Sequence, residues 1–331
     1  MASASIPCPP RSLMDRVGPL PENADDATRR YEEVGQRARD LIVSWLPTDW
    51  GFGERRILDF GCGAGRTLRQ FTGSAEHAAC FVGCDIHFDS VRWAARHLSP
   101  PFGVFRNGER PPLPFRGHTF DLIYAMSVFS HLSETSASWL LELRRVLNPR
   151  GLLIATVPGP ARWAQRVIGS PAPPIEELGR HVDAHGDNFY DSHGPHIYFA
   201  EWWIREHWGR AFEVIAVVDD QTSPPLGIQE GGPAVVVMRS NGRSCTSSEL
   251  ESPNTENPRD ISALVADRPV LLAEIAHLRW DRRRVLSEVD IAVADAIAAR
   301  AELSALRNSR SWRWTGPPRW IRSHIRPSAR S

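Results

Sequence analysis

The chain contains no lysine, and all 39 of its basic residues are arginine. An equal number of acidic residues balances them, so the formal net charge is zero. Without lysine the protein has no side-chain amine that could form a covalent Schiff base. Without a net positive charge it has no overall electrostatic attraction to nucleic acid, and we expect no nucleic-acid partner.

Cysteines and long apolar runs are also scarce. The five cysteines are irregularly spaced and form no C-x-x-C pair, which disfavours a zinc site. No apolar stretch approaches the ~18 residues that span a bilayer. The N-terminus lacks the basic-then-apolar pattern of a secretory signal. We therefore expect a protein of the reducing cytoplasm that holds no metal.

The most informative feature that is present is a run of glycines after an apolar strand. Residues 56–66 are RILDFGCGAGR, in which Gly61, Gly63 and Gly65 stand at alternate positions. Glycine permits a tight turn and lets a ligand approach the backbone where a Cβ atom would clash. The spacing differs from the dinucleotide fingerprint G-x-G-x-x-G, whose third glycine comes one place later.

Acidic residues end this strand and the next one. A carboxylate at Asp59 would repel a pyrophosphate, but it would suit a ligand with a cationic amino-acid end. Asp85 lies about twenty residues beyond the glycines, where α/β nucleotide-binding folds place the acceptor for ribose hydroxyls. Both observations favour S-adenosylmethionine, which carries a sulfonium and an ammonium but no phosphate, over a nicotinamide cofactor.

Further motifs follow in order along the chain. They are Asn107-Gly108, the proline-rich residues 111–115, FDLIYAMSVFSHL at 120–132 and LRRVLNPRGLLIATV at 143–157. In order and spacing, the motifs between about residues 12 and 240 resemble those of class I S-adenosylmethionine-dependent methyltransferases. The resemblance implies S-adenosylmethionine as cofactor and methyl transfer as the reaction.

The resemblance also implies a role for individual residues. Asp59 would hold the amino-acid end of the cofactor, directly or through water, and Asp85 would accept both ribose hydroxyls. Asn107 would bond to the adenine edge, a position where many family members have an acid. The full set of implied cofactor-binding residues is Asp59, Gly61, Gly63, Gly65, Asp85, Asn107, Gly108, Met126 and Ser127, of which Met126 and Ser127 would lie beside the methyl group.

An acceptor hydroxyl has to lose its proton, and histidine is the usual base. In the family arrangement His131, just after the fourth strand, would face the methyl group; helix capping or packing is the alternative role. His193 is the second candidate catalytic residue, with Asp191 and His196 as further alternatives. The loose spacing of the histidines between 181 and 196, without an acidic trio, disfavours a metal site.

Alternating strands and helices predict an α/β fold, a doubly wound Rossmann-like methyltransferase sheet, followed by a C-terminal helical extension. Strands are expected at 55–60, 79–85, 103–106, 120–128, 151–157, 212–218 and 234–238, the last two as an antiparallel hairpin that the resemblance implies. Helices are expected at 27–46, 66–72, 88–98, 134–147 and 201–210. Residues 158–199, rich in proline, glycine and histidine, interrupt this pattern, and we expect them to form a lid that binds the acceptor.

We expect five segments along the chain. They are an N-terminal segment with a cap helix (1–50), the methyltransferase domain (51–240), a polar linker (241–260), a long helix (261–308) and a basic, tryptophan-rich tail (309–331). Apolar residues follow alternating steps of four and three from Leu271 to Leu306, with Arg282 as the one polar exception. This seam favours a coiled coil that self-associates or docks to a partner protein. A single amphipathic helix packed on the catalytic domain is the alternative.

The tail pairs arginines with Trp312, Trp314 and Trp320, a combination that suits peripheral contact with an anionic membrane surface. A disordered extension is the alternative. Residues 309–320 resemble a short segment at the ends of glycosyltransferases and methyltransferases of bacterial surface-polysaccharide assembly. This resemblance implies O-methylation of a sugar or glycan in polysaccharide biosynthesis. The alternatives are a methyltransferase for a small metabolite, a nicotinamide-dependent oxidoreductase and a non-catalytic scaffold.

Overall fold

The computed structural model describes residues 6–17, 20–75, 79–169, 172–183, 196–219 and 233–308. The chain divides into two compact units, Met1–Asp267 and Arg268–Ser331. The predicted residues Asp191 and His193, and the tail from residue 309, lie outside the described part of the chain. Among the described helices, none has a stretch apolar and long enough to cross a membrane.

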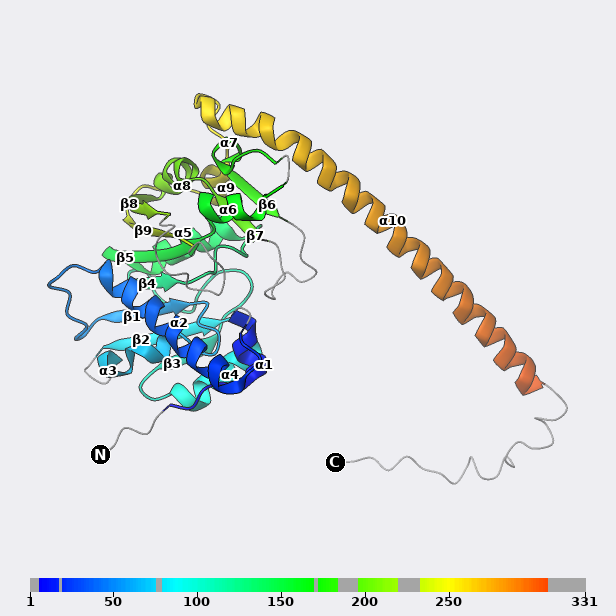
Figure 1. Ribbon diagram of the computed structural model, residues 1–331, viewed down its shortest axis with the longest axis horizontal. Helices are drawn as coiled ribbons and strands as arrows, with labels where there is room; N and C mark the ends of the chain where they lie inside the picture. The colour runs from blue at the N-terminus through cyan, green and yellow to red at the C-terminus, as the bar shows by residue number, and fades with distance from the viewer. Residues whose placement is uncertain are drawn as a thin grey trace, which may run out of the picture. The chain divides into compact units, whose positions relative to one another are not determined.

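A seven-stranded sheet with the order β3-β2-β1-β4-β5-β9-β8 forms the centre of the first unit (Figure 1). Its strands are β1 (Arg56–Phe60), β2 (Cys80–Asp85), β3 (Gly103–Arg106), β4 (Phe120–Ala125), β5 (Leu147–Val157), β8 (Phe212–Val218) and β9 (Ala234–Ser240). Strands β1 to β5 pair in parallel, and β9 runs antiparallel to both β5 and β8. The chain moves outward from β1 to one edge and then from β4 to the other, which confirms the predicted doubly wound sheet.

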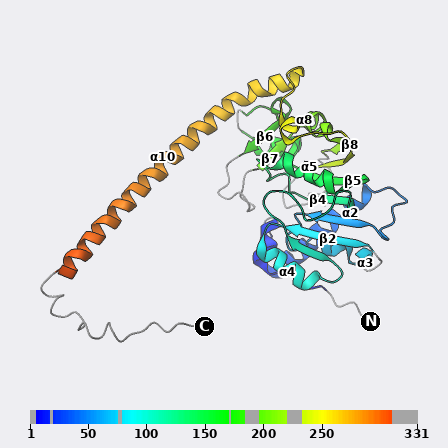
Figure 2. The same cartoon turned by 180° about the vertical axis from the view of Figure 1, so that it is seen from behind.

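Helices cover both faces of this sheet (Figures 1 and 2). Neighbouring strand residues point to opposite faces. Ile57 packs with α2 (Ala24–Ser44) and α4 (Phe88–Leu98), whereas Leu58 packs with α5 (Ser136–Val146) and α8 (Glu201–His207). This two-sided burial explains why the parallel strands are apolar almost throughout. The 3-10 turn η3 (Trp208–Arg210) continues α8.

The N-terminal helix α2 lies directly against the segment that follows the glycine turn. The Asn23 side chain caps α2 by accepting hydrogen bonds from the backbone of Asp25 and Asp26. A Cβ atom at Gly35 would lie 2.4 Å from the carbonyl oxygen of Arg66, so glycine at this position allows the close contact. The segment before α2 contains a short helix α1 (Arg11–Met14) and a 3-10 turn η1 (Asp15–Val17).

Three predicted elements differ in the structure. The crossover helix expected at 66–72 is a 3-10 turn η2 (Leu68–Phe71) followed by one helical turn α3 (Thr72–Ala75). Strand β4 ends three residues before the predicted position 128, because Ser127 adopts a φ of 60° and turns the chain. Strand β5 begins at Leu147, where the predicted helix was expected to end.

The interruption after β5 contains two short helices and a separate hairpin. The helices are α6 (Pro160–Arg166) and α7 (Ile175–Leu178), and β6 (Arg180–Asp183) pairs antiparallel with β7 (His196–Phe199). The hairpin is tied to the ends of the main strands, since Ile197 donates its backbone N–H to the Ser130 carbonyl and Phe199 donates to the Pro158 carbonyl.

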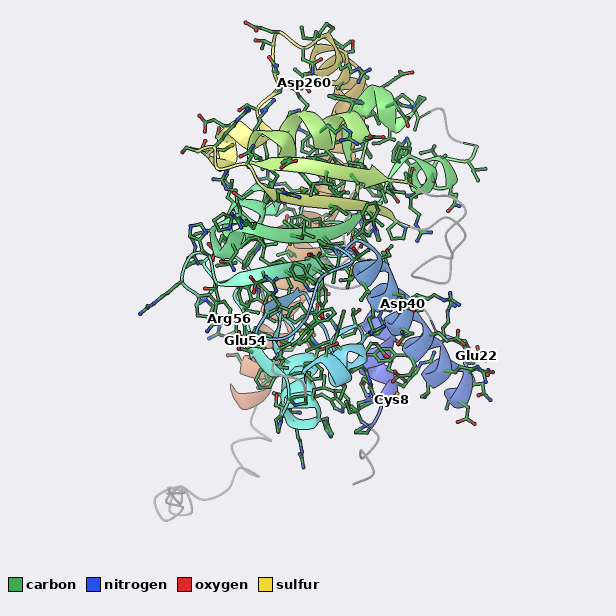
Figure 3. The ribbon with its side chains drawn as sticks, turned by 90° about the vertical axis from the view of Figure 1, so that its left-hand side faces the viewer. Cys8, Glu22, Asp40, Glu54, Arg56 and Asp260 are labelled. Carbon is green, nitrogen blue, oxygen red and sulfur yellow. The ribbon has the colours of Figure 1, made fainter. Side chains whose placement is uncertain are left out.

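The segment 241–260, predicted as a polar linker, packs on the first unit through α9 and Asp260. Helix α9 (Ser247–Glu251) begins with a reciprocal Thr246–Glu249 capping box, and Leu250 is buried. The buried ring of His207 places one nitrogen 3.0 Å from the Leu250 carbonyl and the other 3.0 Å from Asp260, a residue labelled in Figure 3. These contacts hold the segment against the first unit. The following helix α10 (Pro258–Asn308) is one continuous helix.

Candidate functional site

The glycine turn after β1 approaches the turn after β4 very closely. Gly61, Gly63 and Gly65 have φ angles of 82°, 53° and 79°, in the left-handed region that other residues rarely adopt. A Cβ atom at Gly61 would lie 2.4 Å from a methyl carbon of Val128. The backbone N–H groups of Gly61 and Cys62 donate to the Cys84 carbonyl, which fixes the turn to the end of β2. The glycines therefore bring the carboxyl ends of β1, β2 and β4 together.

Asp85 is held at this edge in a defined orientation. One carboxylate oxygen accepts a hydrogen bond of 2.8 Å from the Gly63 N–H, and the other accepts one of 2.8 Å from the His87 N–H. A carboxylate oxygen can accept more than one hydrogen bond. Both oxygens of Asp85 thus keep capacity for the hydroxyl groups of a ligand.

Asp59 lies beneath the glycine turn and is almost completely buried, with 2% of its surface exposed. Burial raises the pKa of Asp59 to about 8, with the nearby Asp85 charge raising it further and Tyr124 and Arg66 opposing the shift. Its Oδ2 atom has no hydrogen-bond partner among the described residues. A buried acceptor without a donor is costly, so this carboxyl group is prepared for a cation or a donor from a ligand.

An open cavity of about 560 Å³ follows β3, at the position predicted for the adenine. It is lined by Ile86, Arg106, Asn107, Gly108, Glu109 and Arg110. The Asn107 side-chain amide donates to the Gly108 carbonyl, whereas its oxygen is buried without a partner in the described part of the chain. Ile86 was not identified from the sequence, although its position as an apolar residue directly after Asp85 is a signal that could have suggested it.

The turn after β4 carries the residues predicted to lie beside the methyl group. Ser127 is a non-glycine residue with φ of 60°, and its N–H donates to the Thr156 hydroxyl at 2.7 Å. Backbone strain of this kind is frequent at functional sites. The Ser130 hydroxyl donates to the Ser127 carbonyl and tightens the turn. Met126 packs partly against the core face shared with α2 and α4. Thr156 was not identified from the sequence.

His131 lies at the end of this turn, close to the β6–β7 hairpin. Its ring centroid is 4.9 Å from that of His196, which was one of the alternative bases. Nearby, Arg180 donates to the Ser133 carbonyl, and His181 packs on Trp163 with ring centroids 4.8 Å apart. The hairpin therefore brings a second histidine to His131. Within the described residues, no three His, Cys, Asp or Glu side chains gather as a metal site, and His185 and His193 lie outside them.

The donors and acceptors at this edge fit S-adenosylmethionine. A buried carboxyl group at Asp59 suits a cationic end, Asp85 suits a diol, and the unpartnered oxygen of Asn107 suits an exocyclic amine. The arrangement can thus hold a cationic nucleoside ligand next to a strained turn that carries histidine.

The comparison with protein families agrees with this geometry. Residues 58–155 match the family model of a methyltransferase domain. The matched segment contains all the predicted cofactor-binding residues and His131, and its strands belong to the Rossmann-like sheet described above. His196 and the β6–β7 hairpin lie beyond the matched segment.

Two curated relatives and one solved structure illustrate the similarity. The probable pectin methyltransferase QUA3 of Arabidopsis thaliana is 27% identical over 127 residues, which cover 38% of this chain and 20% of the relative. The malonyl-[acyl-carrier protein] O-methyltransferase of Legionella pneumophila is 30% identical over 173 residues, which cover 50% of this chain and 57% of the relative. A putative S-adenosylmethionine-dependent methyltransferase of Listeria monocytogenes aligns with 14% identity and a TM-score of 0.47, covering 63% of this chain and 99% of that one. The chain thus spans between a fifth and just over half of the length of these curated relatives.

Proposed function

We propose that this protein is an S-adenosylmethionine-dependent methyltransferase. The observation that carries the proposal is the pair of acidic side chains at the glycine turn: the buried Asp59, whose Oδ2 atom has no partner among the described residues, and the oriented Asp85. The methyltransferase-domain match over residues 58–155 supports the same cofactor. When bound, this cofactor supplies a methyl group that is already activated by its sulfonium.

The protein's own residues would bind and orient the reactants. Asp59 would hold the ammonium of the cofactor, Asp85 its ribose hydroxyls and Asn107 its adenine edge. Positioning and exclusion of water are the main tasks in such a displacement, because the leaving group needs no further activation. The turn at Met126 and Ser127 would form the wall between cofactor and acceptor.

We propose further that the acceptor is a hydroxyl group of a sugar or glycan in surface-polysaccharide assembly. A hydroxyl needs a base, and the adjacent rings of His131 and His196 supply two candidates at the end of this turn. The resemblance of residues 309–320 to segments of polysaccharide-assembly enzymes supports this class of acceptor, and so does the name of the pectin methyltransferase relative.

A carboxyl group on a small metabolite is the second candidate acceptor, which the malonyl-[acyl-carrier protein] O-methyltransferase relative supports. A carboxylate is already ionised at neutral pH and needs no base. The two acceptors are therefore distinguishable by their dependence on histidine. The presence of Asp59, Asp85 and the three glycines disfavours a non-catalytic scaffold, because a scaffold would not need a cofactor site.

Cofactor binding is tested first by calorimetry with S-adenosylmethionine, S-adenosylhomocysteine and NAD. We expect both sulfur compounds to bind and NAD not to bind. Asp85→Ala should weaken binding by about 1–3 kcal/mol, because the ribose loses a charged acceptor. Asp85→Asn, which keeps an acceptor for the Gly63 N–H, should lose less. Unchanged affinity in Asp85→Ala would disprove the ribose assignment.

The acceptor is tested by transfer of a labelled methyl group to sugar nucleotides, lipid-linked saccharides and small carboxylic acids. For a hydroxyl acceptor, whichever of His131→Ala and His196→Ala removes the base should have a kcat about 10²–10⁴-fold lower than wild type. The affinity for S-adenosylhomocysteine should stay unchanged in both variants. A rate that is independent of both histidines, with label on a carboxylic acid, would favour the second candidate.

A further inference from the structure

Helix α10 exposes apolar side chains along much of its length. It runs for 51 residues from Pro258 to Asn308, and the part beyond Asp267 belongs to the second unit. Val285, Val289 and Leu303 expose 49%, 50% and 52% of their surfaces. A single helix in water gains little from its backbone alone, and helices of this length usually owe their stability to packing. The exposed apolar residues therefore need a partner.

The apolar pattern assigns a heptad register to this helix. The a positions are Ile275, Arg282, Val289, Ala296 and Leu303, and the d positions are Leu271, Leu278, Val285, Ala292, Ala299 and Leu306. The flanking positions then show an unequal distribution of charge. Every g position is acidic: Glu274, Asp281, Glu288, Asp295 and Glu302. The e positions are arginine or apolar: Leu272, Arg279, Leu286, Val293, Arg300 and Arg307.

This distribution selects one orientation for two copies of the helix. In a parallel pair, each g residue faces the e residue of the next heptad on the other helix, whereas an antiparallel pair brings g to g and e to e. Antiparallel pairing would place acids against acids and arginines against arginines. Parallel pairing places three acids opposite arginines: Glu274 opposite Arg279, Asp295 opposite Arg300 and Glu302 opposite Arg307.

The remaining acids and the polar seam residue agree with an in-register pair. Glu288 would face Val293 of the other copy, and on its own helix it lies 4.0 Å from Arg284. Asp281 occupies the g position beside Arg282, so the acid of one copy can neutralise the arginine of the other. A single polar a position is a known device for specifying register and a two-stranded state. A shift by one heptad would lose charge pairs and bury Arg282 against Val289.

We propose that residues 271–306 form a parallel, in-register, two-stranded coiled coil with a second copy of this chain. The two catalytic units would then be attached to the same end of the coil. The proposal rests on α10 alone and is independent of the reaction proposed above.

The first test is the solution mass of the full chain by light scattering over a range of protein concentrations. We expect twice the chain mass of 37.0 kDa. Asp295→Arg/Glu302→Arg places arginine opposite arginine and should dissociate the dimer, and mixing it with Arg300→Glu/Arg307→Glu should restore the dimer. Asp290→Arg, at a b position outside the seam, is the control and should stay dimeric. A monomeric or trimeric wild-type chain, or a charge variant that stays dimeric, would overturn the proposal.

The second test measures orientation by disulfide formation. The three cysteines that are not buried, Cys8, Cys80 and Cys245, are first replaced by serine. A cysteine introduced by Ala299→Cys at a d position should then cross-link the dimer under mild oxidation. Ala298→Cys, its neighbour outside the seam, is the matched control. An antiparallel pair would hold the two 299 positions about 30 Å apart, given a rise of ~1.5 Å per residue. A dimer without this cross-link would therefore refute the parallel orientation.

Discussion

Replacement of Asp59 by asparagine should change how the stability of the cofactor-free protein depends on pH. Burial raises the pKa of Asp59 from its ordinary value of 3.8 to about 8 in the folded protein. The folded state therefore holds a proton on this group that the unfolded chain has already released. The resulting stabilisation is fully present below the unfolded pKa and is lost as the pH rises toward the folded pKa.

The size of the effect follows from the pKa difference. One pKa unit corresponds to about 1.36 kcal/mol, so between about pH 5 and about pH 8 this group should lower the stability of the wild-type protein by roughly 4 kcal/mol. Asparagine is neutral throughout this range and resembles the protonated acid in shape. The free energy of unfolding of Asp59→Asn, relative to wild type, should therefore rise by roughly the same 4 kcal/mol between the two pH values.

Urea unfolding of both proteins at several pH values, followed by tryptophan fluorescence, measures this difference. All other titrating groups are shared, so their contributions cancel in the comparison. Asp89→Asn, whose side chain on α4 is 58% exposed, controls for the removal of one carboxylate. A difference between Asp59→Asn and wild type that does not change with pH would show that Asp59 is ionised in the cofactor-free protein, and the reasoning from burial would be wrong.

The same shift predicts a proton released on cofactor binding. A ligand cation beside Asp59 favours the ionised form, so binding below about pH 8 should expel up to about one proton. Calorimetry in buffers of different ionisation enthalpy detects this release. Asp59→Asn should release fewer protons on binding and should bind S-adenosylmethionine more weakly.

Three further predictions concern packing and the tail. Gly61→Ala should lower the free energy of unfolding of the domain by about 1–3 kcal/mol, because the new Cβ atom would lie 2.4 Å from Val128 at a φ of 82°. Adding Val128→Ala should restore part of this free energy in denaturant titrations, since it relieves the contact but not the φ strain. His207→Ala should lower the free energy of unfolding by about 1–3 kcal/mol, because the buried acceptors at Leu250 and Asp260 lose their hydrogen-bond partner. A chain truncated after residue 245 lacks both acceptors and should melt at a lower temperature than one truncated after residue 267. The full chain should sediment with anionic vesicles at low salt and less at high salt, because its tail carries many arginines and interleaved tryptophans. Equal sedimentation of a chain that ends at Leu306 would show that the tail does not bind the vesicles.

Local sequence determined the elements and the chemical character of the site. Gly61, Gly63 and Gly65 after an apolar strand predicted the turn, and the acids at the ends of two strands predicted the kind of ligand. Handedness rules for parallel strands were enough to predict the doubly wound sheet. The heptad pattern of α10 is likewise contained in its sequence, because such a pattern depends on residues only three or four positions apart.

Only the tertiary structure decided which distant residues meet. The contact between Gly61 and Val128, the proximity of His131 to His196 and the packing of His207 against Asp260 all join residues far apart in sequence. The polar composition of residues 241–260 is typical of a linker, yet Leu250 is buried against the domain. The raised pKa of Asp59 also results from burial, which the sequence alone does not give. Propensity and periodicity act over a few residues, whereas burial and side-chain contact depend on how the whole chain folds back on itself.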